Sequence, residues 1–143
     1  MPKSDVTKLI SSLMNTQRLI GDKIRRDEDV GFFSITQLEI LRYIDVERQP
    51  LMREVAEYLK VTPPSVTFLI DPLVRAGKLR RLSDKKDRRI VRLAITAKGK
   101  RALNEGFKKI KGRVGGVFEK LNKKEINSLI KIHQKIAVIL KNK

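Results

Sequence analysis

The hydrophobic pattern changes its period at Gly77, from the spacing of a helix to that of β-strands. Before the glycine, apolar residues recur every three or four positions, at Val66, Leu69, Ile70, Leu73 and Val74. After it, Leu79 begins one strand, and Val91, Leu93 and Ile95 alternate along a second strand, as in a hairpin. The sequence therefore predicts a helix that leads directly into a β-hairpin.

The predicted helix spans residues 62–77. Thr62 is a favourable N-cap, and Pro63 suits the first helical position because its missing N–H costs nothing there. Pro72 lies inside the helix, where a proline removes one hydrogen bond and costs roughly 3 kcal/mol. We expect a kink at Pro72; the alternative is a helix that ends at Asp71.

Further helices are predicted on both sides of this segment. They are a helix over residues 5–26, one that begins at a capping box from Thr36 to Glu39, one over 51–59, a long one capped by Thr96, and a last one that begins at Asn122 and Glu125.

This order predicts a mainly α fold with a small β-hairpin wing. Residues 34–96 form a winged helix-turn-helix, with the recognition helix at 62–77 and the wing at 78–95. The segments 1–33 and 97–143 carry apolar stripes with no sheet to cover them. We expect these outer helices to interleave with a second copy, so that the whole is one intertwined homodimer.

The positive charge is concentrated in the second half of the chain. Residues 1–77 carry 11 Lys/Arg and 11 Asp/Glu, whereas residues 78–143 carry 22 and 5, which accounts for the whole net charge of +17. Clustered cations repel one another unless phosphates offset the cost, so this pattern favours a nucleic-acid partner. A solvated cationic surface and attraction to anionic lipid are the alternatives.

Composition excludes several classes of protein. The chain has no Cys and a single His, so disulfides, thiolate metal sites and a zinc site are not expected. No apolar run approaches a membrane span, and the first ten residues lack the apolar stretch of a signal peptide, so we expect a cytoplasmic protein without a membrane partner. No catalytic constellation or phosphate loop is present, so neither an enzyme nor a cofactor is predicted.

His133 falls on the apolar stripe of the last helix. We expect a buried, hydrogen-bonded structural histidine at this position, and the alternative is a titrating switch at the dimer interface.

The helix order and the string from Ser65 to Gly99 resemble the MarR family of repressors, which are dimeric winged-helix proteins. The matching positions are Ser65, Val66, Leu73, Val74, Gly77, Leu79, Asp87, Arg88, Arg89, Thr96 and Gly99. The chain departs from the family at Phe68, where members usually have a polar or basic residue, and at Lys78, where they have an apolar one. The resemblance implies that a small anionic, lipophilic molecule, such as a phenol, releases the DNA; a regulator without a ligand fits the residues equally.

The recognition helix is expected to enter the major groove with its N-terminal residues closest to the bases. The residues nominated there are Thr62, Pro64, Ser65, Thr67 and Phe68. An outward Phe68 could lie against a thymine methyl group, and the alternative is a ring folded back onto the protein. Phosphate contacts are expected from Arg53, Arg75, Arg80, Arg81 and Arg92.

The hairpin tip is expected to approach the minor groove. It carries the cations Lys85, Lys86, Arg88 and Arg89. In the family, the arginine of an Asp-x-Arg pattern is inserted there. That arginine maps to Arg89, with Asp87 placed to hold its guanidinium by a bidentate pair. A simple exposed basic loop is the alternative.

The predicted dimer interface comprises apolar residues of the outer helices, namely Leu9, Leu13, Phe118, Leu121, Ile126, Leu129, Ile130, Ile136 and Leu140. Gly112, Gly115 and Gly116 interrupt the long helix at roughly 1 kcal/mol each relative to alanine. They require a reason, which is either a close approach between helices or a bend that sets the separation of the two DNA-binding heads.

These features favour a sequence-specific, homodimeric regulator of transcription, usually a repressor. A low-specificity architectural DNA-binding protein is the alternative, favoured slightly by the 11 Lys/Arg against 2 acids from residue 108 onward. A winged helix that docks onto another transcription protein is a third hypothesis, which the tip sequence from Asp87 to Arg89 disfavours.

Overall fold

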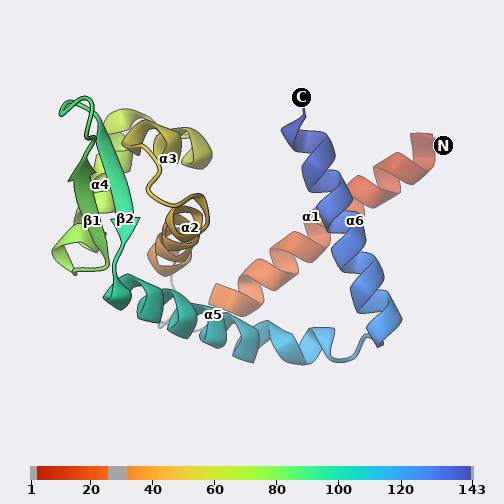
Figure 1. Ribbon diagram of the computed structural model, residues 1–143. Coiled ribbons are helices and arrows are strands. Elements are labelled where there is room, and N and C mark those ends of the chain that lie inside the picture. Colours follow the sequence, from red (N-terminus) through yellow and green to blue (C-terminus); the bar gives the residue numbers. More distant parts are fainter. Residues whose placement is uncertain (1–2, 26–31, 143) are drawn as a thin grey trace. The chain divides into compact units, whose positions relative to one another are not determined.

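The computed structural model describes residues 3–25 and 32–142 (Figure 1). The elements in chain order are α1 (Lys3–Arg25), α2 (Phe32–Glu47), α3 (Met52–Leu59), α4 (Pro63–Arg75), β1 (Leu79–Ser83), β2 (Val91–Ile95), α5 (Ala97–Phe118) and α6 (Lys123–Lys141). The mainly α fold with a small hairpin is confirmed. The chain divides into a winged unit, Ile24–Lys109, and a helical unit, Met1–Lys23 with Ile110–Lys143. The predicted ends of two segments, residues 26 and 143, lie outside the described residues.

The core of the winged unit joins α2, α3, α4, the hairpin and the start of α5. Its buried members are Ile40, Leu41, Ile44, Val55, Ala56, Val66, Ile70, Leu73, Leu79, Leu93 and Leu103. Three of them come from the apolar face predicted for α4. Full burial of a Leu, Ile or Val side chain contributes roughly 1.5–3 kcal/mol, so this cluster contributes substantially to the stability of the unit.

Helix α2 begins earlier than the sequence suggested. The capping box predicted from Thr36 to Glu39 is wrong, because α2 already begins at Phe32 and Thr36 lies in its second turn. The segment from residue 32 to residue 35 contains no glycine or proline, so nothing in it stops helical hydrogen bonding from extending upstream of Thr36.

Helix α4 continues through Pro72 to Arg75, so the alternative end at Asp71 is wrong. Leu73 is only 1% exposed, and this burial offsets the hydrogen bond that the proline cannot make. The N–H of Ala76 donates to the carbonyl of Pro72 at 3.0 Å. Gly77 follows with φ +73°, a left-handed conformation that glycine adopts without strain, and the chain turns into β1.

The hairpin is antiparallel, with Leu79 opposite Ile95 and Ser83 opposite Val91. Residues before α3 extend the pairing, because Leu51 forms an isolated bridge with Arg92 and the N–H of Leu93 donates to the carbonyl of Pro50 at 2.9 Å. The base of the wing is therefore attached to the turn between α2 and α3.

The start of α5 is attached to the end of α4. The hydroxyl of Thr96 accepts the N–H of Gly99 at 3.0 Å and donates to the carbonyl of Gly77 at 2.6 Å, so the predicted cap is confirmed. A Cβ at Gly99 would overlap the Lys78 carbonyl, and one at Gly106 would overlap the side chain of Leu38. Both glycines therefore permit close packing of α5 within the winged unit.

The three later glycines of α5 have no such neighbours among the described residues. A Cβ would meet nothing within 4 Å at Gly112 or Gly116, and only the Lys111 side chain of the same helix at Gly115. The predicted close approach between helices is therefore not made by the described residues of a single chain.

Helices α1 and α6 of the helical unit have no buried residue along their described lengths. Their large apolar side chains are exposed instead, at Val6, Leu9, Ile10, Leu13, Met14, Leu19, Leu129, Ile130, Ile132, Ile136, Val138, Ile139 and Leu140. The prediction that His133 is buried is wrong for this chain, because no neighbouring element covers that face of α6. None of the helices in the described ranges is long and apolar enough to cross a membrane.

The start of α6 agrees with the sequence prediction. The side-chain carbonyl of Asn122 accepts the N–H of Glu125 at 2.8 Å, and the Glu125 carboxylate accepts the N–H of Asn122 at 2.8 Å. This reciprocal capping box satisfies two helix-end donors and fixes where α6 begins.

Candidate nucleic-acid interface

The N-terminal end of α4 presents a set of exposed side chains. The hydroxyl of Thr62 accepts the N–H of Ser65 at 3.4 Å and donates to the Ser65 hydroxyl at 3.0 Å, while the Thr67 hydroxyl donates to the carbonyl of Pro63 at 3.2 Å. Every residue nominated for the major groove is exposed: Thr62, Pro64, Ser65, Thr67 and Phe68. Local hydrogen bonds therefore orient hydroxyl groups at the surface where base edges would lie.

Phe68 is the aromatic residue of this set, with 70% of its surface accessible. The alternative in which its ring folds back onto the protein is therefore wrong for the described chain. The exposed ring is therefore available to contact a partner.

Among the arginines nominated for phosphate contact, Arg53, Arg75 and Arg80 are exposed. Arg81 forms an ion pair with Asp71 of α4, which links β1 to the recognition helix. Because both side chains of this pair are partly exposed, the Arg81 guanidinium still reaches solvent.

Arg92 has a different environment from the one expected. Its Nε donates to Asp84 Oδ1 at 2.9 Å and its Nη1 donates to the carbonyl of Gln49 at 3.1 Å. Two of its donors are thus used inside the winged unit, while the side chain is 38% exposed, and the contact of Arg92 with the DNA backbone stays a prediction.

The tip of the hairpin is a closed loop organised by Asp84, a residue that the sequence analysis did not single out. Asp84 Oδ2 accepts the N–H groups of Lys86 and Asp87 at 3.2 and 3.3 Å. The loop is closed where the Ile90 N–H donates to the Asp87 carbonyl and the Asp84 N–H donates to the Ile90 carbonyl, both at 3.0 Å. An Asp that begins a turn of polar residues is the sequence signal that could have identified it.

Asp87 holds Arg89 by the bidentate pair that was expected. Arg89 Nε lies 3.2 Å from Asp87 Oδ1 and Arg89 Nη2 lies 3.3 Å from Asp87 Oδ2, while the Arg89 N–H donates to Oδ1 at 3.0 Å. The Arg89 side chain is nevertheless 91% exposed. Its orientation is thus restricted, while its outer edge stays open to a partner.

Hydrogen bonds keep both tip carboxylates ionised. The Arg92 guanidinium lowers the pKa of Asp84, and the Arg89 guanidinium with the Arg89 N–H lowers the pKa of Asp87. A carboxylate whose pKa lies below its ordinary value of about 4 is ionised at neutral pH. The wing therefore has the same charges and hydrogen bonds throughout the neutral range.

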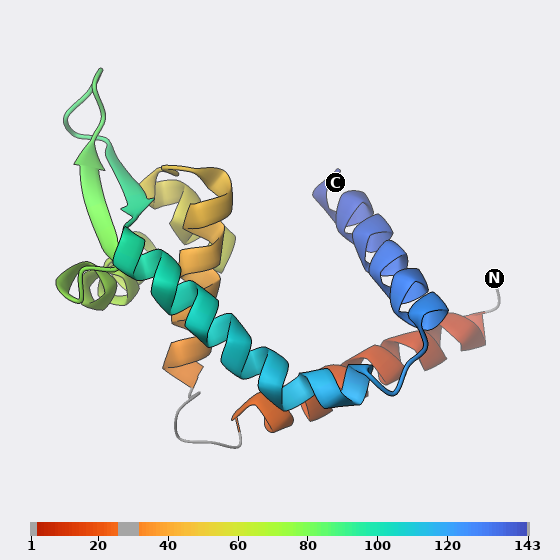
Figure 2. The ribbon, with the colours of Figure 1, turned by 60° about the horizontal axis from the view of Figure 1, so that its bottom comes forward.

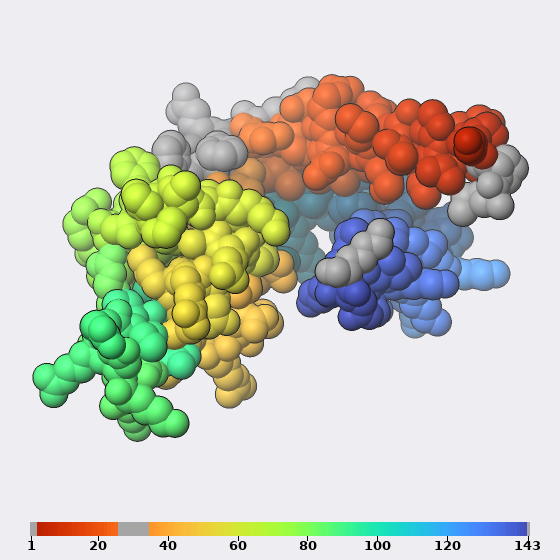
Figure 3. Space-filling view, turned by 90° about the horizontal axis from the view of Figure 1, so that it is seen from above, coloured from red at the N-terminus to blue at the C-terminus, as the bar shows by residue number. Residues whose placement is uncertain are grey.

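The tip stands clear of the helices in the winged unit. Figure 2 shows the loop between β1 and β2 beyond the end of the strands, and Figure 3 shows its side chains extending from the body of that unit. The four tip cations are all exposed, at Lys85, Lys86, Arg88 and Arg89. Because Asp84 and Asp87 are both paired, this end of the unit presents cations outward.

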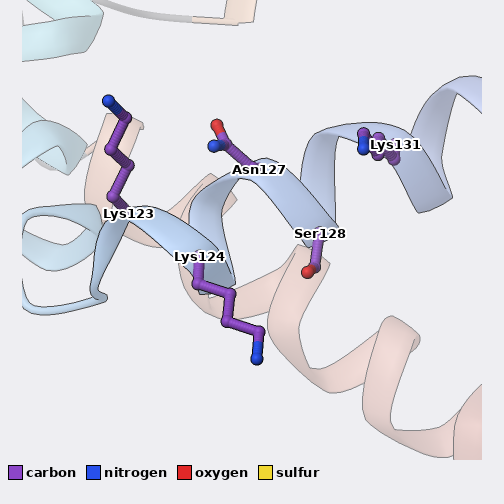
Figure 4. A pocket seen from close by; sticks show the side chains of 5 residues that line it. All are labelled: Lys123, Lys124, Asn127, Ser128 and Lys131. Carbon is purple, nitrogen blue, oxygen red and sulfur yellow. The ribbon is translucent and has the colours of Figure 1, made fainter.

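A hollow of about 550 Å³ lies along the first turns of α6 (Figure 4). Its lining consists of Lys123, Lys124, Asn127, Ser128 and Lys131. The side chains do not converge, because Lys123 and Asn127 point to one side of the helix while Lys124 and Ser128 point to the other. Nor do the described residues contain a group of three or more His, Cys, Asp or Glu placed to hold a metal ion.

An exposed polar helix end, a tight turn before it and a basic hairpin after it define the class: this is a winged helix-turn-helix protein that binds DNA. A sequence model of the MarR family matches residues 33–91. The uncharacterized HTH-type transcriptional regulator YkoM of Bacillus subtilis (strain 168) is 27% identical over 113 residues, which cover 79% of this chain and 73% of YkoM. Residues 33–91 thus match the MarR family, whose members are transcription regulators and not enzymes.

Solved structures share the fold over nearly the whole chain. A MarR family protein from Bacillus stearothermophilus matches with a TM-score of 0.76 at 22% identity, covering 96% of this chain and 99% of that one. Streptococcus pneumoniae FabT, solved in complex with DNA, matches with a TM-score of 0.65 at 21% identity, covering 99% of both chains. At these identities the likeness establishes the fold, and the choice of DNA sequence must come from this chain's own residues.

Proposed function

We propose that this chain is a homodimeric regulator that binds a pseudo-palindromic operator in duplex DNA and represses transcription by blocking polymerase. The observation that carries the proposal is the pairing of an exposed α4 end with a wing whose Arg89 is held by Asp87 and 91% exposed. A protein that binds only the DNA backbone has no need of such a preset pair. The alternative, a low-specificity architectural protein, is favoured only by the lysine-rich end of the chain.

Each part of the winged unit has a proposed role. Exposed residues of α4 contact base edges in the major groove, and Arg89 enters the minor groove of A·T-rich DNA. The proposed DNA-contacting residues are Arg53, Thr62, Pro64, Ser65, Thr67, Phe68, Arg75, Arg80, Arg81, Lys85, Lys86, Arg88 and Arg89, with Asp87 as the residue that holds Arg89.

The homodimer forms part of the proposal because the helical unit leaves its apolar faces uncovered. Leu9, Leu13, Ile130 and Leu140 are each at least 45% exposed in one chain. Single exposed apolar residues are ordinary, but stripes along two helices of one unit are typical of a surface that another subunit covers. Two copies would place two winged units on half-sites about one helical turn apart.

Release of the operator by a small anionic, lipophilic compound of the phenolic kind is included on the strength of the family alone. Such a compound needs an apolar cavity with a few polar groups. The hollow on α6 does not meet this need, because lysine, asparagine and serine side chains line it. Adding such compounds to the protein–operator complex, with loss of the complex as the expected result, tests this part.

Replacement of Lys85 and Lys86 together by alanine is expected to weaken binding to operator and to random DNA by the same factor. Each lost phosphate contact should reduce the slope of log K against log salt by about 0.9. Titrations at several salt concentrations measure both quantities, and the matched control replaces the exposed Lys108 and Lys109 of α5. A larger loss for operator than for random DNA would mean that these lysines recognise sequence.

Phe68 is expected to contact one thymine methyl group in each half-site. Replacing that dT by dU removes only the methyl group, and affinity should fall by about 0.8 kcal/mol. A Phe68→Ala protein should bind the dT and dU duplexes equally well. The same replacement in the flanking sequence is the control, and a Phe68→Ala protein that still prefers dT would contradict the assignment.

A further inference from the structure

Arg92 occupies a junction in the winged unit. In β2 it lies opposite Leu82 of β1 on one edge, and on the other edge it forms the isolated bridge with Leu51. Its backbone therefore joins the hairpin to the segment that leads into α3.

The side chain of Arg92 joins the wing tip to the turn between α2 and α3. Nε donates to Asp84 Oδ1, at the beginning of the wing tip, and Nη1 donates to the carbonyl of Gln49, after the end of α2. The other oxygen of Asp84, Oδ2, accepts the N–H groups of Lys86 and Asp87. A continuous chain of hydrogen bonds thus runs from the α2–α3 turn through one guanidinium to the tip that carries Arg89.

The turn at the start of this chain has an uncommon conformation. Arg48 and Gln49 are consecutive residues with φ values of 51° and 57°, in the left-handed region that residues other than glycine seldom adopt. This conformation persists only where surrounding contacts hold it, and two such contacts involve β2: the bond from Arg92 to Gln49 and the bond from the Leu93 N–H to Pro50.

We propose that Arg92 and Asp84 form a clamp that positions the wing tip. The clamp fixes the orientation of Arg89 relative to the α2–α3 turn. The inference rests on the proposed minor-groove role of Arg89. Arg92 and Asp84 are positioning residues that act through Arg89.

The chemistry of the clamp requires these two side chains. A guanidinium presents donors in a fixed planar fork, which lets it reach a carboxylate and a carbonyl at once, whereas a lysine ammonium acts as a single point charge. Asp84 uses one oxygen for Arg92 and the other for the tip amides, and an asparagine of the same shape keeps only one of these acceptors. Arg92→Lys and Asp84→Asn therefore weaken the clamp with little change in side-chain volume.

The first test uses the free protein. Amide hydrogen exchange measured by NMR should become about tenfold faster or more at Lys86 and Asp87 in both clamp variants, with unchanged exchange at the core residue Ile70. Arg101→Lys, a conservative change of an exposed arginine in α5, serves as the control and should alter none of these rates. Unchanged exchange at Lys86 and Asp87 in both variants would overturn the clamp.

The second test separates positioning from general stabilisation. On operator DNA, Arg92→Lys and Asp84→Asn should each weaken binding about tenfold, and neither should weaken it further when Arg89 is already alanine. Losses that add to that of Arg89→Ala would show that the clamp does not act through Arg89 and would overturn the proposal. If Arg89→Ala alone leaves affinity unchanged, the minor-groove role fails instead, and the exchange rates still decide whether the clamp orders the tip.

Discussion

A Leu129→Asp chain is expected to be a monomer at micromolar concentrations and to lose most of its affinity for the operator. In the proposed dimer, the two-fold axis places a copy of this residue from each chain in the interface. An unpaired charge buried there costs roughly 3–5 kcal/mol, and each dimer would contain two. A monomer would also bind one half-site at a time, without the gain in affinity that comes from linking two DNA-binding units.

Leu129 suits this test because its replacement should disturb few contacts within one chain. Leu129 is 39% exposed, and α6 has no buried residue, so the winged unit should keep its core. Asn127→Asp is the matched control, since it adds the same charge on the polar side of the same helix. Light scattering on both proteins measures the mass, and a dimer that persists in Leu129→Asp would refute the placement of the interface.

Arg89→Ala is expected to weaken operator binding by roughly 1–3 kcal/mol without unfolding the protein. The Arg89 side chain is 91% exposed and bonds to Asp87 at the tip, so the core does not depend on it. The loss should fall mainly on operators with A·T-rich segments where the wing lies, because a narrow minor groove there concentrates negative potential.

Competition binding with operator and random duplexes measures this loss. Arg101→Ala is the matched control, because it removes an exposed arginine of α5 to which no DNA contact is assigned. Unchanged operator affinity in Arg89→Ala would eliminate the minor-groove role. An equal loss for operator and random DNA would reduce Arg89 to a phosphate contact.

Much of the winged unit could be predicted because its signals are local. Thr62 and Pro63 begin α4, Gly77 ends it, and Thr96 caps α5, each through a side chain or backbone preference that acts within a few residues. The bidentate pair of Asp87 and Arg89 is local too, since a single residue separates the partners.

The errors arose where distant residues decide the outcome. The bond from Arg92 to Gln49 was not predicted, because the two residues lie 43 positions apart in the sequence. Asp84 was missed because its importance depends on that same arginine. His133 was expected to be buried because it lies on an apolar stripe, yet a stripe does not reveal whether this chain or a second subunit covers it.

Selection of bound duplexes from a random-sequence pool, at about physiological salt, tests the central claim of sequence-specific binding most directly. The selected sequence should be a pseudo-palindrome with half-sites about one turn apart, preferred over random DNA by about 10³ or more. A pool that stays random, with selected and unselected duplexes bound equally, would contradict the account and identify an architectural protein whose exposed α4 residues do not choose sequence.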